Sequence, residues 1–477
     1  MVKKSKKPNP VLQKLLIGFG VLLYMFIAFI VGLAASQADY FAENIMLVKM
    51  GLEDGKHEKK FPTEYYESLH TWTDDPAKVH NKFILTSAAY RTNPALLLID
   101  RDGRLLHFWN VDNVYTNKEV IKWHEIKDPS NGGTSSIDDA ILFPNGDVIA
   151  FQDNRMVSNY RGQRLFRMDK DSHILWQIEG QFHHEIDLGA DGNIYALDYE
   201  LRDHYPIIDH HKKEPVKFLA DVIVKVSQDG KILDTISVPD AFVDTPYDFY
   251  LYSFDLDVPT VQEFTFPYKD THAFDPEHTN SVQYLDGRLA SRLPFAQNGD
   301  LLISMRGPSL LAVLRPSTGK IVWAAKGAWH HQHNVRLLSS GVIRMFDNEG
   351  ASMFVDDDEG KIKKVYKSRI LDYNPVTAQT SVRFFAPEYH DTWSFWRGGH
   401  YEMEDGSLLV TSTAQSRVLQ ISPEGKIVWE LRGIGDREYE GAAYRQRIVF
   451  AKPYAPEYPR FLYEKPQPDS TDNPAKE

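Results

Sequence analysis

The sequence predicts an all-β fold, a six-bladed β-propeller with an N-terminal transmembrane helix. Similar units of short apolar segments recur after residue 82, and turn dipeptides such as Asn-Gly and Asp-Gly separate the segments. Alternating strands joined by such turns form antiparallel meanders. Four-stranded meanders repeated around an axis make a propeller, and six units fit the repeats of this chain. One uncharged apolar run near the N-terminus predicts the helix.

A closing segment with two aliphatic residues followed by tryptophan recurs in three of the units, at Trp176, Trp323 and Trp429. A fixed aromatic side chain on the outer strand of each unit indicates packing between neighbouring sheets. Helical repeats are excluded, because apolar runs with a period of about 3.6 residues are scarce after Ala35. A β-sandwich does not explain similar units at this spacing.

The composition is that of a globular, acidic protein. Of the 477 residues, 42% are hydrophobic, and the formal net charge is -12. This apolar content excludes a disordered or collagen-like chain. The charge argues against nucleic acid as the main partner, because neutralising phosphates needs basic patches. The chain contains no cysteine, so disulfides, zinc–thiolate sites and a cysteine nucleophile are excluded.

Residues 1–14 form a lysine-rich tail, and residues 15–35 form an apolar run without charges. As a helix with a rise of about 1.5 Å per residue, this run spans about 30 Å, which matches a bilayer core. The lysines before it favour a cytoplasmic N-terminus. We therefore expect a single-pass inner-membrane protein whose globular part is periplasmic or otherwise extracytoplasmic. The alternative is a cleaved signal peptide, because Ser36, Gln37 and Ala38 resemble a cleavage site, although the run is longer than most signal sequences.

The remaining chain divides into three parts by composition and repeat pattern. We expect a stalk or linker over residues 36–81, the propeller over residues 82–465, and a polar, proline-rich, disordered tail over residues 466–477. Two stretches interrupt the repeats, residues 201–217 and 239–276, and we interpret both as insertions on one face of the ring. Each of them either shapes a pocket or only packs on the ring.

Histidines recur at one place in the repeats. His184 and His333 each lie eight residues before the first turn glycine of their unit, as Asp138 does, while His278 lies nine and His400 six residues before theirs. The first strand of each propeller unit lines the central channel, so these side chains are expected to converge at one mouth of it. A single buried histidine usually binds a backbone carbonyl. Several together need compensating partners or a chemical role.

Further polar residues accompany the histidines. Asn280 follows His278 by two positions and lies on the same strand face. Arg306, after the apolar segment LLISM, is placed to hold an oxyanion, and His331 shares a face with His333.

Arg397, beside Gly398 and Gly399, is a further candidate, whereas Asp347 and Asn348 are interpreted as part of a hairpin or loop. The chain lacks a nucleophilic serine elbow, a phosphate-binding loop and a dinucleotide fingerprint. Imidazoles with arginine and asparagine suit the transfer of an anionic group with one histidine as nucleophile. They also suit a metal site, since two histidines separated by one residue on a strand have a familiar ligand spacing.

Four segments of the chain resemble one known family. They are HHEIDLGADGNIYAL, DPEHTNSVQYL, SMRG and QHNVRLLSSGVIRMFDN, and the similarity extends from about Asp138 to Tyr458. These segments resemble the bacterial arylsulfotransferases that work without a nucleotide sulfate donor. The resemblance implies a six-bladed propeller exported from the cytoplasm, with its active site in the central channel. It also implies ping-pong transfer of a sulfuryl group from an aryl sulfate to a phenol through a sulfohistidine.

The resemblance also assigns roles to residues. It implies that His333 is the nucleophile, that His278 and Asn280 form the family's H-x-N element, that Arg306 is its channel arginine, and that His184 is its early-blade histidine. From their register we expect His400, His331 and Asp138 to bind substrate. The expected partners are small aryl sulfates and phenols, with the membrane as the anchor and no cofactor or metal.

Two other functions remain open at this point. One is a metal-dependent hydrolase with His184, His278, His331 and His333 as ligands in the channel. The other is a non-catalytic propeller that binds a partner on its face.

Overall fold

The computed structural model describes most of the predicted propeller. The described residues are 70–90, 93–111, 136–153, 164–206, 217–253, 264–265, 272–356, 362–385, 392–432, 437–439, 442–444 and 448–464. The chain divides into two compact units, residues 1–62 and 63–477. The predicted tail 1–14, the predicted anchor 15–35 and the predicted C-terminal tail 466–477 lie outside the described residues. Across the described ranges, the helices are all too short or too polar to cross a bilayer.

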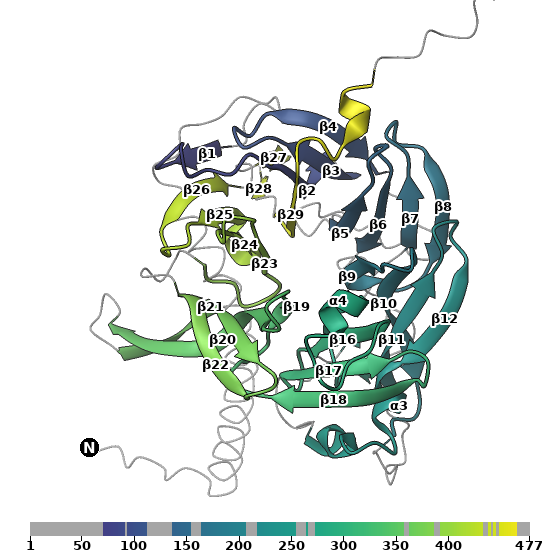
Figure 1. Ribbon diagram of the computed structural model, residues 1–477. Coiled ribbons are helices and arrows are strands. Elements are labelled where there is room, and N and C mark those ends of the chain that lie inside the picture. Colours follow the sequence, from purple (N-terminus) through teal and green to yellow (C-terminus); the bar gives the residue numbers. More distant parts are fainter. Residues whose placement is uncertain are drawn as a thin grey trace, which may run out of the picture. The chain divides into compact units, whose positions relative to one another are not determined.

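Six antiparallel sheets are arranged around a central axis, as Figure 1 shows. We number them blades 1 to 6 along the chain. Blade 2 contains β5 (Ser136–Leu142), β6 (Val148–Asp153), β7 (Arg164–Met168) and β8 (Ile174–Glu179). Blade 3 contains β9 (His183–Leu188), β10 (Ile194–Arg202), β11 (Lys217–Val226) and β12 (Ile232–Ser237). Blade 4 contains β15 (Thr279–Leu285), β16 (Asp300–Met305), β17 (Leu310–Arg315) and β18 (Lys320–Lys326).

The last blades follow the same order from the axis outward. Blade 5 contains β19 (His333–Leu337), β20 (Ile343–Asp356), β21 (Ile362–Asn374) and β22 (Gln379–Phe385). Blade 6 contains β23 (Gly399–Glu402), β24 (Leu408–Ser412), β25 (Arg417–Ile421) and β26 (Ile427–Arg432). The prediction of an all-β, six-bladed propeller is thereby confirmed.

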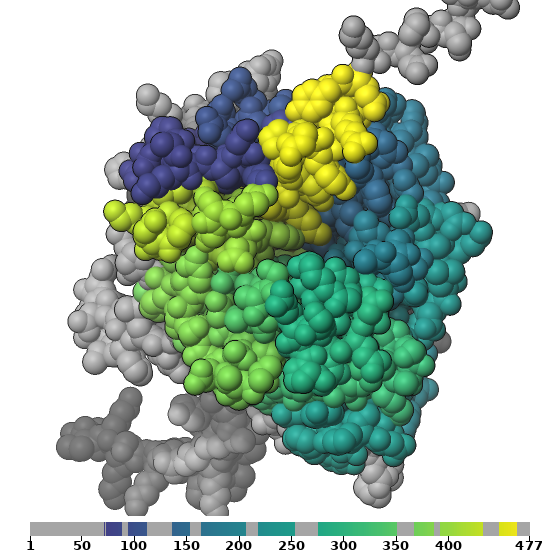
Figure 2. Space-filling model, viewed as in Figure 1, coloured from purple at the N-terminus to yellow at the C-terminus, as the bar shows by residue number. Residues whose placement is uncertain are grey.

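Blade 1 is assembled from the two ends of the ring. It contains β29 (Ala451–Tyr454), β2 (Phe83–Tyr90), β3 (Asn93–Ile99) and β4 (Leu105–Asn110). The C-terminal strand β29 pairs antiparallel with β2, with Tyr454 opposite Phe83 and Ala451 opposite Thr86. In Figure 2 the yellow C-terminal residues accordingly lie beside the purple residues of blade 1. The ring is therefore closed by hydrogen bonds between segments far apart in the sequence, which leaves no open edge between its ends.

The predicted stalk, residues 36–81, is described from His70 on. There β1 (His70–Thr73) pairs antiparallel with β26 and becomes a fifth, outermost strand of blade 6. His70 lies opposite Arg432 and Thr73 lies opposite Trp429. The described end of this segment thus belongs to the propeller sheet.

The two predicted insertions both lie at blade 3. The first, residues 201–217, is described at its ends, where β10 finishes and β11 begins. The second, residues 239–276, contributes α3 (Val238–Phe242), η3 (Asp248–Ser253), β13 (Phe264–Thr265) and β14 (His272–Phe274). The hydroxyl of Ser237 caps α3, and β14 pairs in parallel with the start of β11. The remaining short elements are α4 (Gly287–Ala290), η4 (Thr413–Gln415), η5 (Arg460–Leu462) and the hairpin of β27 (Arg437–Tyr439) and β28 (Ala442–Tyr444).

The core of the described propeller lies between the blades. Each of its six apolar clusters joins two neighbouring sheets, and blades 6 and 1 are joined in the same way as the others. Along β16, Leu301 and Ile303 face blade 3, whereas Leu302 faces blade 5. Because both faces are covered, the strand is buried throughout. Each such leucine or isoleucine contributes about 1.5–3 kcal/mol by its burial.

The recurrent tryptophans lie on the fourth strands of their blades, which are outermost in blades 2 and 4, whereas β1 lies outside the fourth strand of blade 6. Trp429 is fully buried between blades 6 and 1, and Trp323 stacks on Phe295 with ring centroids 4.8 Å apart. The indole of Trp176 reaches blade 3, where its N–H donates to the Gln228 carbonyl at 2.8 Å.

Candidate active site

The inner strands of four neighbouring blades carry a β-bulge near their first residues. The register shifts after Ile137 in β5, after His183 in β9, after Thr279 in β15 and after His333 in β19. A bulge places extra residues opposite the partner strand and re-aims their side chains. The residues that fall in these bulges include Asp138, His184, Glu185, Asn280 and Asn334. Of the residues in the predicted histidine register, Asp138 and His184 lie in a bulge, whereas His278 and His333 lie just before one.

The bulged residues line a cavity between the inner strands. Its wall contains Asp138, Asp139, His184, Glu185, Asn280, His333, Asn334, Arg397, Gly398, Gly399, Tyr401, Thr411, Val449, Phe450 and Ala451. Four residues predicted for the site, Asp138, His184, Asn280 and His333, thus lie together although blades 2 to 5 supply them. The segment that leads into β29 adds the apolar side chains of Val449 and Phe450. Polar groups and an apolar wall therefore face the same space.

The other four predicted residues do not line this cavity. The ring of His278 lies 4.9 Å from that of His184, centroid to centroid, in an edge-to-face arrangement. The His331 carbonyl lies 3.0 Å from His333 Nδ1, and the charge of Arg306 acts on His333. His400 is buried, and its backbone N–H donates to the Asn334 Oδ1 at 2.8 Å. The pairs of β23 with β24 show no register shift, so no bulge turns His400 toward the cavity.

His333 is held as a neutral imidazole with a defined tautomer. Its Nδ1 lies 2.8 Å from Asn348 Oδ1 and 3.0 Å from the His331 carbonyl oxygen, both of which are acceptors. Its Nε2 accepts the backbone N–H of Arg397 at 3.2 Å. The proton is therefore on Nδ1 and the lone pair is on Nε2. Burial, together with the charge of Arg306, lowers the pKa of His333 to about 3.

Asn348 fixes this tautomer because its own orientation is fixed. Its amide N–H groups donate to the carbonyls of Ser394 at 2.8 Å and of Arg397 at 2.6 Å. The oxygen must then face His333, since only the amide nitrogen is able to donate to two carbonyls. The interpretation of Asp347 and Asn348 as a hairpin or loop was wrong, because both lie within β20. Their role depends on the pairing of blade 5 and is not visible in the local sequence.

The backbone beside His333 adopts left-handed conformations at three neighbouring residues. Asn334, Arg397 and Gly398 have φ values of 48°, 51° and 91°. A Cβ atom on Gly398 would lie 2.6 Å from the Phe346 ring, so only glycine fits this position. The pair of Arg397 and Gly398 therefore brings a backbone N–H to Nε2 of His333. Strained residues that are held by surrounding structure are typical of functional sites.

Arg397 also contributes its side chain to the cavity. Its guanidinium forms a buried ion pair with Asp138 of β5. Asp138 belongs to blade 2, whereas Arg397 lies just before the first strand of blade 6. Both side chains are almost fully buried, at 7% and 1% exposure. The predicted substrate residue Asp138 is thus engaged with an arginine, which leaves the pair nearly neutral.

His184 and His278 form a second group of imidazoles next to His333. His278 Nδ1 lies 2.6 Å from Asp275 Oδ2, and both groups are buried. His184 Nδ1 lies 2.7 Å from Nδ1 of the preceding His183. The His184 ring is 6.0 Å from the His333 ring, so a group bound at Nε2 of His333 is within reach of it. Asp275 and His183 were not singled out in the sequence.

Asn280 and Arg306 both lie near His278, Asn280 along the chain and Arg306 through a backbone hydrogen bond. Asn280 Nδ2 donates to the Gln332 carbonyl at 2.7 Å, which fixes its amide next to the strand that carries His333. Arg306 is half-buried, and its backbone N–H donates to the His278 carbonyl at 3.0 Å. Its charge lowers the pKa values of His333 and His331. The arginine is therefore close enough to act on the site electrostatically.

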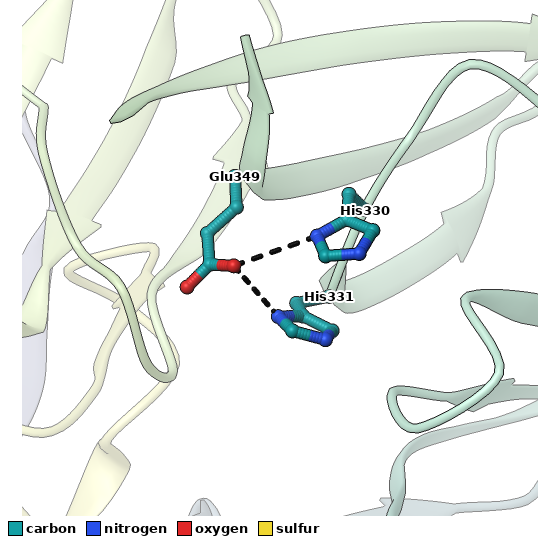
Figure 3. Close-up of side chains that lie close together, drawn as sticks. All are labelled: His330, His331 and Glu349. Atoms are coloured by element: carbon teal, nitrogen blue, oxygen red, sulfur yellow. Dashed lines mark hydrogen bonds and ion pairs between the residues drawn. The ribbon is translucent and has the colours of Figure 1, made fainter. Parts of the chain in front are cut away.

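A hydrogen-bonded cluster of His330, His331 and Glu349 lies behind His333, and Figure 3 shows both imidazoles directed at one carboxylate. His331 Nδ1 lies 2.8 Å and His330 Nδ1 lies 3.4 Å from Glu349 Oε2. Burial acts to raise the pKa of Glu349, but the two histidines and the charge of Arg306 hold it below its usual range. His331 therefore contacts Glu349 and, through its carbonyl, His333.

Within the described ranges these three residues are the one group with the spacing of metal ligands. The four histidines of the metal-dependent alternative, His184, His278, His331 and His333, do not form such a group there. Of the four histidines in the metal-dependent alternative, His331 alone therefore belongs to a described group with ligand spacing.

A network of side chains below the cavity connects the bulges to one another. Glu185 accepts hydrogen bonds from Asn334 Nδ2 at 2.9 Å and from the Ser281 hydroxyl at 2.9 Å, and it pairs with Arg336 at 2.9 Å. Asn334 Oδ1 in turn accepts the His400 backbone N–H. Blades 3, 4, 5 and 6 are thereby tied together next to the cavity, which holds its lining in place.

The site combines a neutral, oriented imidazole, buried cationic groups and further imidazoles. These are the parts needed to move an anionic group onto a histidine and away from it. Comparisons with solved structures find chains of low sequence identity and low structural similarity. A protein of unknown function from Bacteroides caccae has 11% identity and a TM-score of 0.44, covering 78% of this chain and 99% of that one. A virginiamycin B lyase from Staphylococcus aureus has 11% identity and a TM-score of 0.33, covering 61% and 69%.

A streptogramin B lyase has 9% identity and a TM-score of 0.35, covering 82% of this chain and 99% of that one. No curated protein matches the sequence. The model of the arylsulfotransferase (ASST) family matches residues 139–434, which is more than half of the chain. The match includes every residue placed in the site except Asp138 and residues 449–451. The protein therefore belongs to the arylsulfotransferase (ASST) family.

Proposed function

We propose that this protein transfers a sulfuryl group from an aryl sulfate to a phenolic acceptor by a ping-pong mechanism, with His333 as the nucleophile. The observation that carries the proposal is the state of His333, which is neutral and has its lone pair on Nε2 at the cavity wall. A neutral imidazole is the form that attacks sulfur. Family membership supports a sulfotransferase-type function with small aryl substrates.

In the first half-reaction a bond forms between His333 Nε2 and sulfur, and the bond from sulfur to the phenolic oxygen breaks. The electron pair of that bond leaves with the phenolate, whose pKa of about 10 makes it a moderate leaving group. In the second half-reaction an acceptor phenol attacks the sulfohistidine and returns His333 to its starting form. No cofactor enters this balance.

The sulfuryl oxygens need donors that are already in place, because preorganised dipoles stabilise developing charge most effectively. Asn280, with one N–H held by Gln332, presents its amide next to His333. Arg306 supplies positive charge beside the nucleophile. The Arg397 backbone N–H, which contacts Nε2 before substrate binds, is a third candidate donor for an oxygen of the bound group.

The aryl ring requires an apolar surface near the same point. Phe450 and Val449 line the cavity from the segment leading into β29, and Tyr401 lines it from β23. We assign the aryl ring of donor and acceptor to this side. The strand that closes the propeller would then also support the substrate pocket.

The enzymatic proposal is tested with a chromogenic aryl sulfate and an acceptor phenol. Release of the chromogenic phenol should depend on the acceptor and should give parallel lines in double-reciprocal plots, as expected for a ping-pong reaction. His333→Asn should abolish release, whereas His173→Asn, at an exposed histidine between β7 and β8, should leave it unchanged. Release that continues without acceptor, or that survives His333→Asn, would contradict the proposal.

We also propose that residues 15–35 anchor the protein in the inner membrane, with the propeller in the periplasm. The support is the apolar run and the lysines before it. Membranes washed with alkaline carbonate should retain the full chain, and a variant lacking residues 1–35 should remain in the soluble fraction of the cytoplasm. Recovery of the full chain in the carbonate wash would contradict an anchor.

A further inference from the structure

Three buried polar side chains, those of His184, His183 and Asp221, lie in a row that begins at the cavity wall. His184 lines the cavity, His183 precedes it in β9, and Asp221 lies in β11 of the same blade. His183 Nδ1 is 2.7 Å from His184 Nδ1, and His183 Nε2 is 3.6 Å from Asp221 Oδ1. We infer that Asp221, His183 and His184 form a proton relay that supplies the proton to the departing phenolate and takes it back from the acceptor phenol. This inference rests on the proposed function.

The contact between the two histidines permits one proton only. Two Nδ1 atoms at 2.7 Å form a hydrogen bond when one of them carries a proton and the other presents a lone pair. If the proton is on His183, then neutral His184 carries its own proton on Nε2, at the cavity. If the proton is on His184, then its Nε2 presents a lone pair instead. The tautomer of His183 therefore decides whether His184 acts as an acid or as a base.

The protonation of Asp221 decides the tautomer of His183 in the same way. The 3.6 Å between Asp221 Oδ1 and His183 Nε2 is longer than a hydrogen bond, so the relay requires these two side chains to approach each other. In that closer contact a protonated Asp221 donates to His183 Nε2, which places the histidine proton on Nδ1. An ionised Asp221 requires a proton on His183 Nε2, because a carboxylate and a lone pair repel each other. The three residues thus have two matched states, one with a proton on Asp221 and an acidic His184, and one with a carboxylate and a basic His184.

The backbone is shaped to bring these side chains together. Consecutive residues in an extended strand point to opposite faces, so adjacent histidines do not normally meet. His184 has a left-handed φ of 59° at the bulge of β9, and this breaks the alternation. The ring of His183 is held by stacking on Tyr199, with centroids 3.9 Å apart and planes within 13°. A non-glycine residue at positive φ destabilises the fold, and such residues are typical of functional sites.

Asp221 is the buried end of the row. It is fully buried, and its Oδ2 accepts the Thr279 backbone N–H. Among the described residues its Oδ1 has no hydrogen bond within normal length, which leaves this oxygen facing His183 Nε2. Burial and the nearby carboxylates of Asp275 and Glu277 raise its pKa well above the usual value. The proton is therefore expected on Asp221 at rest.

The other titratable groups around Asp221 are engaged with one another. Asp275 is paired with His278 and accepts the Tyr199 hydroxyl at 3.4 Å. Glu277 accepts the Tyr205 hydroxyl at 2.6 Å, and the charge of Arg202 acts on it. None of these hydrogen bonds of Asp275 and Glu277 involves His183 or His184. Asp221 is thus the carboxyl group that the His183–His184 pair connects to the substrate.

The proton balance of the two half-reactions is closed by this relay. As the phenolate leaves sulfur, it takes the proton from His184 Nε2. His184 Nδ1 then receives the proton of His183 Nδ1, and His183 Nε2 receives the proton of Asp221, which becomes a carboxylate. The acceptor phenol reverses each transfer when it attacks the sulfohistidine. Asp221 therefore stores the proton while the sulfuryl group is on His333.

The kinetic test uses Asp221→Asn, which preserves the shape of the side chain but cannot release a proton. Glu277→Gln is the matched control, because Glu277 is equally buried in the same carboxylate group but has no contact with His183. First half-reaction rates are measured for aryl sulfates whose phenols differ in pKa. A positioned acid contributes about 100-fold or more to poor leaving groups and little to nitrophenolates. Asp221→Asn should therefore lower rates about 100-fold for unactivated phenols and leave nitrophenyl sulfates nearly unchanged.

The outcomes separate the relay from the proposed function. The relay is wrong if the unaltered protein transfers the sulfuryl group and Asp221→Asn shows the same dependence of rate on the pKa of the leaving phenol. It is also wrong if Glu277→Gln makes that dependence as steep as Asp221→Asn does. If the unaltered protein releases no phenol, the proposed function is wrong. In that case the relay is tested by NMR of protein whose histidine ring nitrogens are labelled with nitrogen-15. The spectrum should show the tautomers of His183 and His184 changing together with pH and becoming fixed in Asp221→Asn, and independent tautomers would overturn the relay.

Discussion

Asn348 and His333 are linked by a 2.8 Å hydrogen bond between Asn348 Oδ1 and His333 Nδ1, and this bond determines which imidazole nitrogen faces the cavity. The two residues lie on neighbouring strands of blade 5, β20 and β19. The amide of Asn348 is itself held by two carbonyls, so the orientation does not depend on His333. The nucleophile proposed here is therefore prepared by the sheet before substrate binds.

Replacement of Asn348 by alanine should lower kcat by about 10-fold to 100-fold with a smaller change in KM, because the protonated Nδ1 of His333 loses the shorter of its two acceptor contacts and keeps only the His331 carbonyl. Steady-state kinetics with one donor and one acceptor measures this effect. Ser368→Ala is the control, since the Ser368 hydroxyl bonds the Asn348 carbonyl and Ser394 in the same region without contacting His333. An equal loss of kcat in both variants would show that the effect comes from a less ordered segment around Ser394 and not from the tautomer of His333.

Replacement of Asn348 by aspartate should change the pH dependence. A carboxylate beside Nδ1 stabilises the imidazolium, so the pKa of His333 should rise from about 3 toward its ordinary value. The neutral form is the nucleophile, so activity should then fall as pH decreases through the raised pKa. The profile of the first half-reaction rate against pH measures this shift. An unchanged acid limb would show that His333 is not the titrating nucleophile.

The buried ion pair of Arg397 and Asp138 should matter for stability more than any exposed pair. Asp138→Ala leaves a buried guanidinium without this carboxylate, which should cost about 3–5 kcal/mol in the free energy of unfolding. The exposed pair of Arg104 and Asp102 provides the control, and Asp102→Ala should cost less than about 1 kcal/mol. Urea unfolding of both variants measures the difference. Similar small losses would mean that Asp138 contributes little to holding Arg397.

His80 should destabilise the protein in acid. Burial, together with the charge of Lys82, lowers the pKa of His80 to about 4. Below pH 6.5 the unfolded chain binds a proton at this residue and the folded protein does not, so its contribution to stability falls as pH decreases toward 4. His80→Asn keeps an acceptor for the Lys82 backbone N–H, which His80 Nδ1 accepts at 3.0 Å, and removes the titration.

Relative to the unaltered protein, His80→Asn should therefore gain about 2–3 kcal/mol between pH 7 and 4.5. Urea unfolding at the two pH values gives this difference directly. A constant difference between the two proteins would contradict a depressed pKa at His80.

The C-terminal strand should be indispensable to the ring. A chain that ends after residue 447 lacks β29, which exposes the inner edge of β2 and removes Phe450 from the cavity wall. It should lose cooperative thermal unfolding or aggregate. A chain that ends after Glu464 should unfold like the full protein. Cooperative unfolding of the shorter chain at the same temperature would show that blade 1 is stable without closure.

The repeat pattern predicted most of the fold because each blade is a local meander. Hairpin strands are adjacent in sequence, so turn glycines and alternating apolar residues suffice to locate them. The closure by β29 was not foreseen, since this strand is separated from β2 by the whole ring. The apolar unit from Phe83 to Trp109 contains three strands, and nothing local indicates where the fourth comes from.

The candidate site was predicted in part for the same reason. His184 and His333 have the same register in their repeats, and Asn280 follows the register residue His278. All three line one cavity, either in a bulge or beside one. His400 occupies a similar position without a bulge, so its ring remains buried elsewhere. Residues that act through another side chain, such as Asn348 and Asp221, depend on strand pairing and on contacts between distant segments. A sequence pattern carries no signal for such contacts.

The most direct test of the account is the intact mass of the protein, lacking residues 1–35, after mixing with an aryl sulfate in the absence of acceptor. We expect a gain of one SO3 mass, its location on His333 by peptide mapping at neutral pH, and its disappearance when a phenol is added. His333→Asn should show no gain. A protein that releases phenol while its mass stays unchanged, or that carries the label on another residue, would contradict a sulfohistidine at His333.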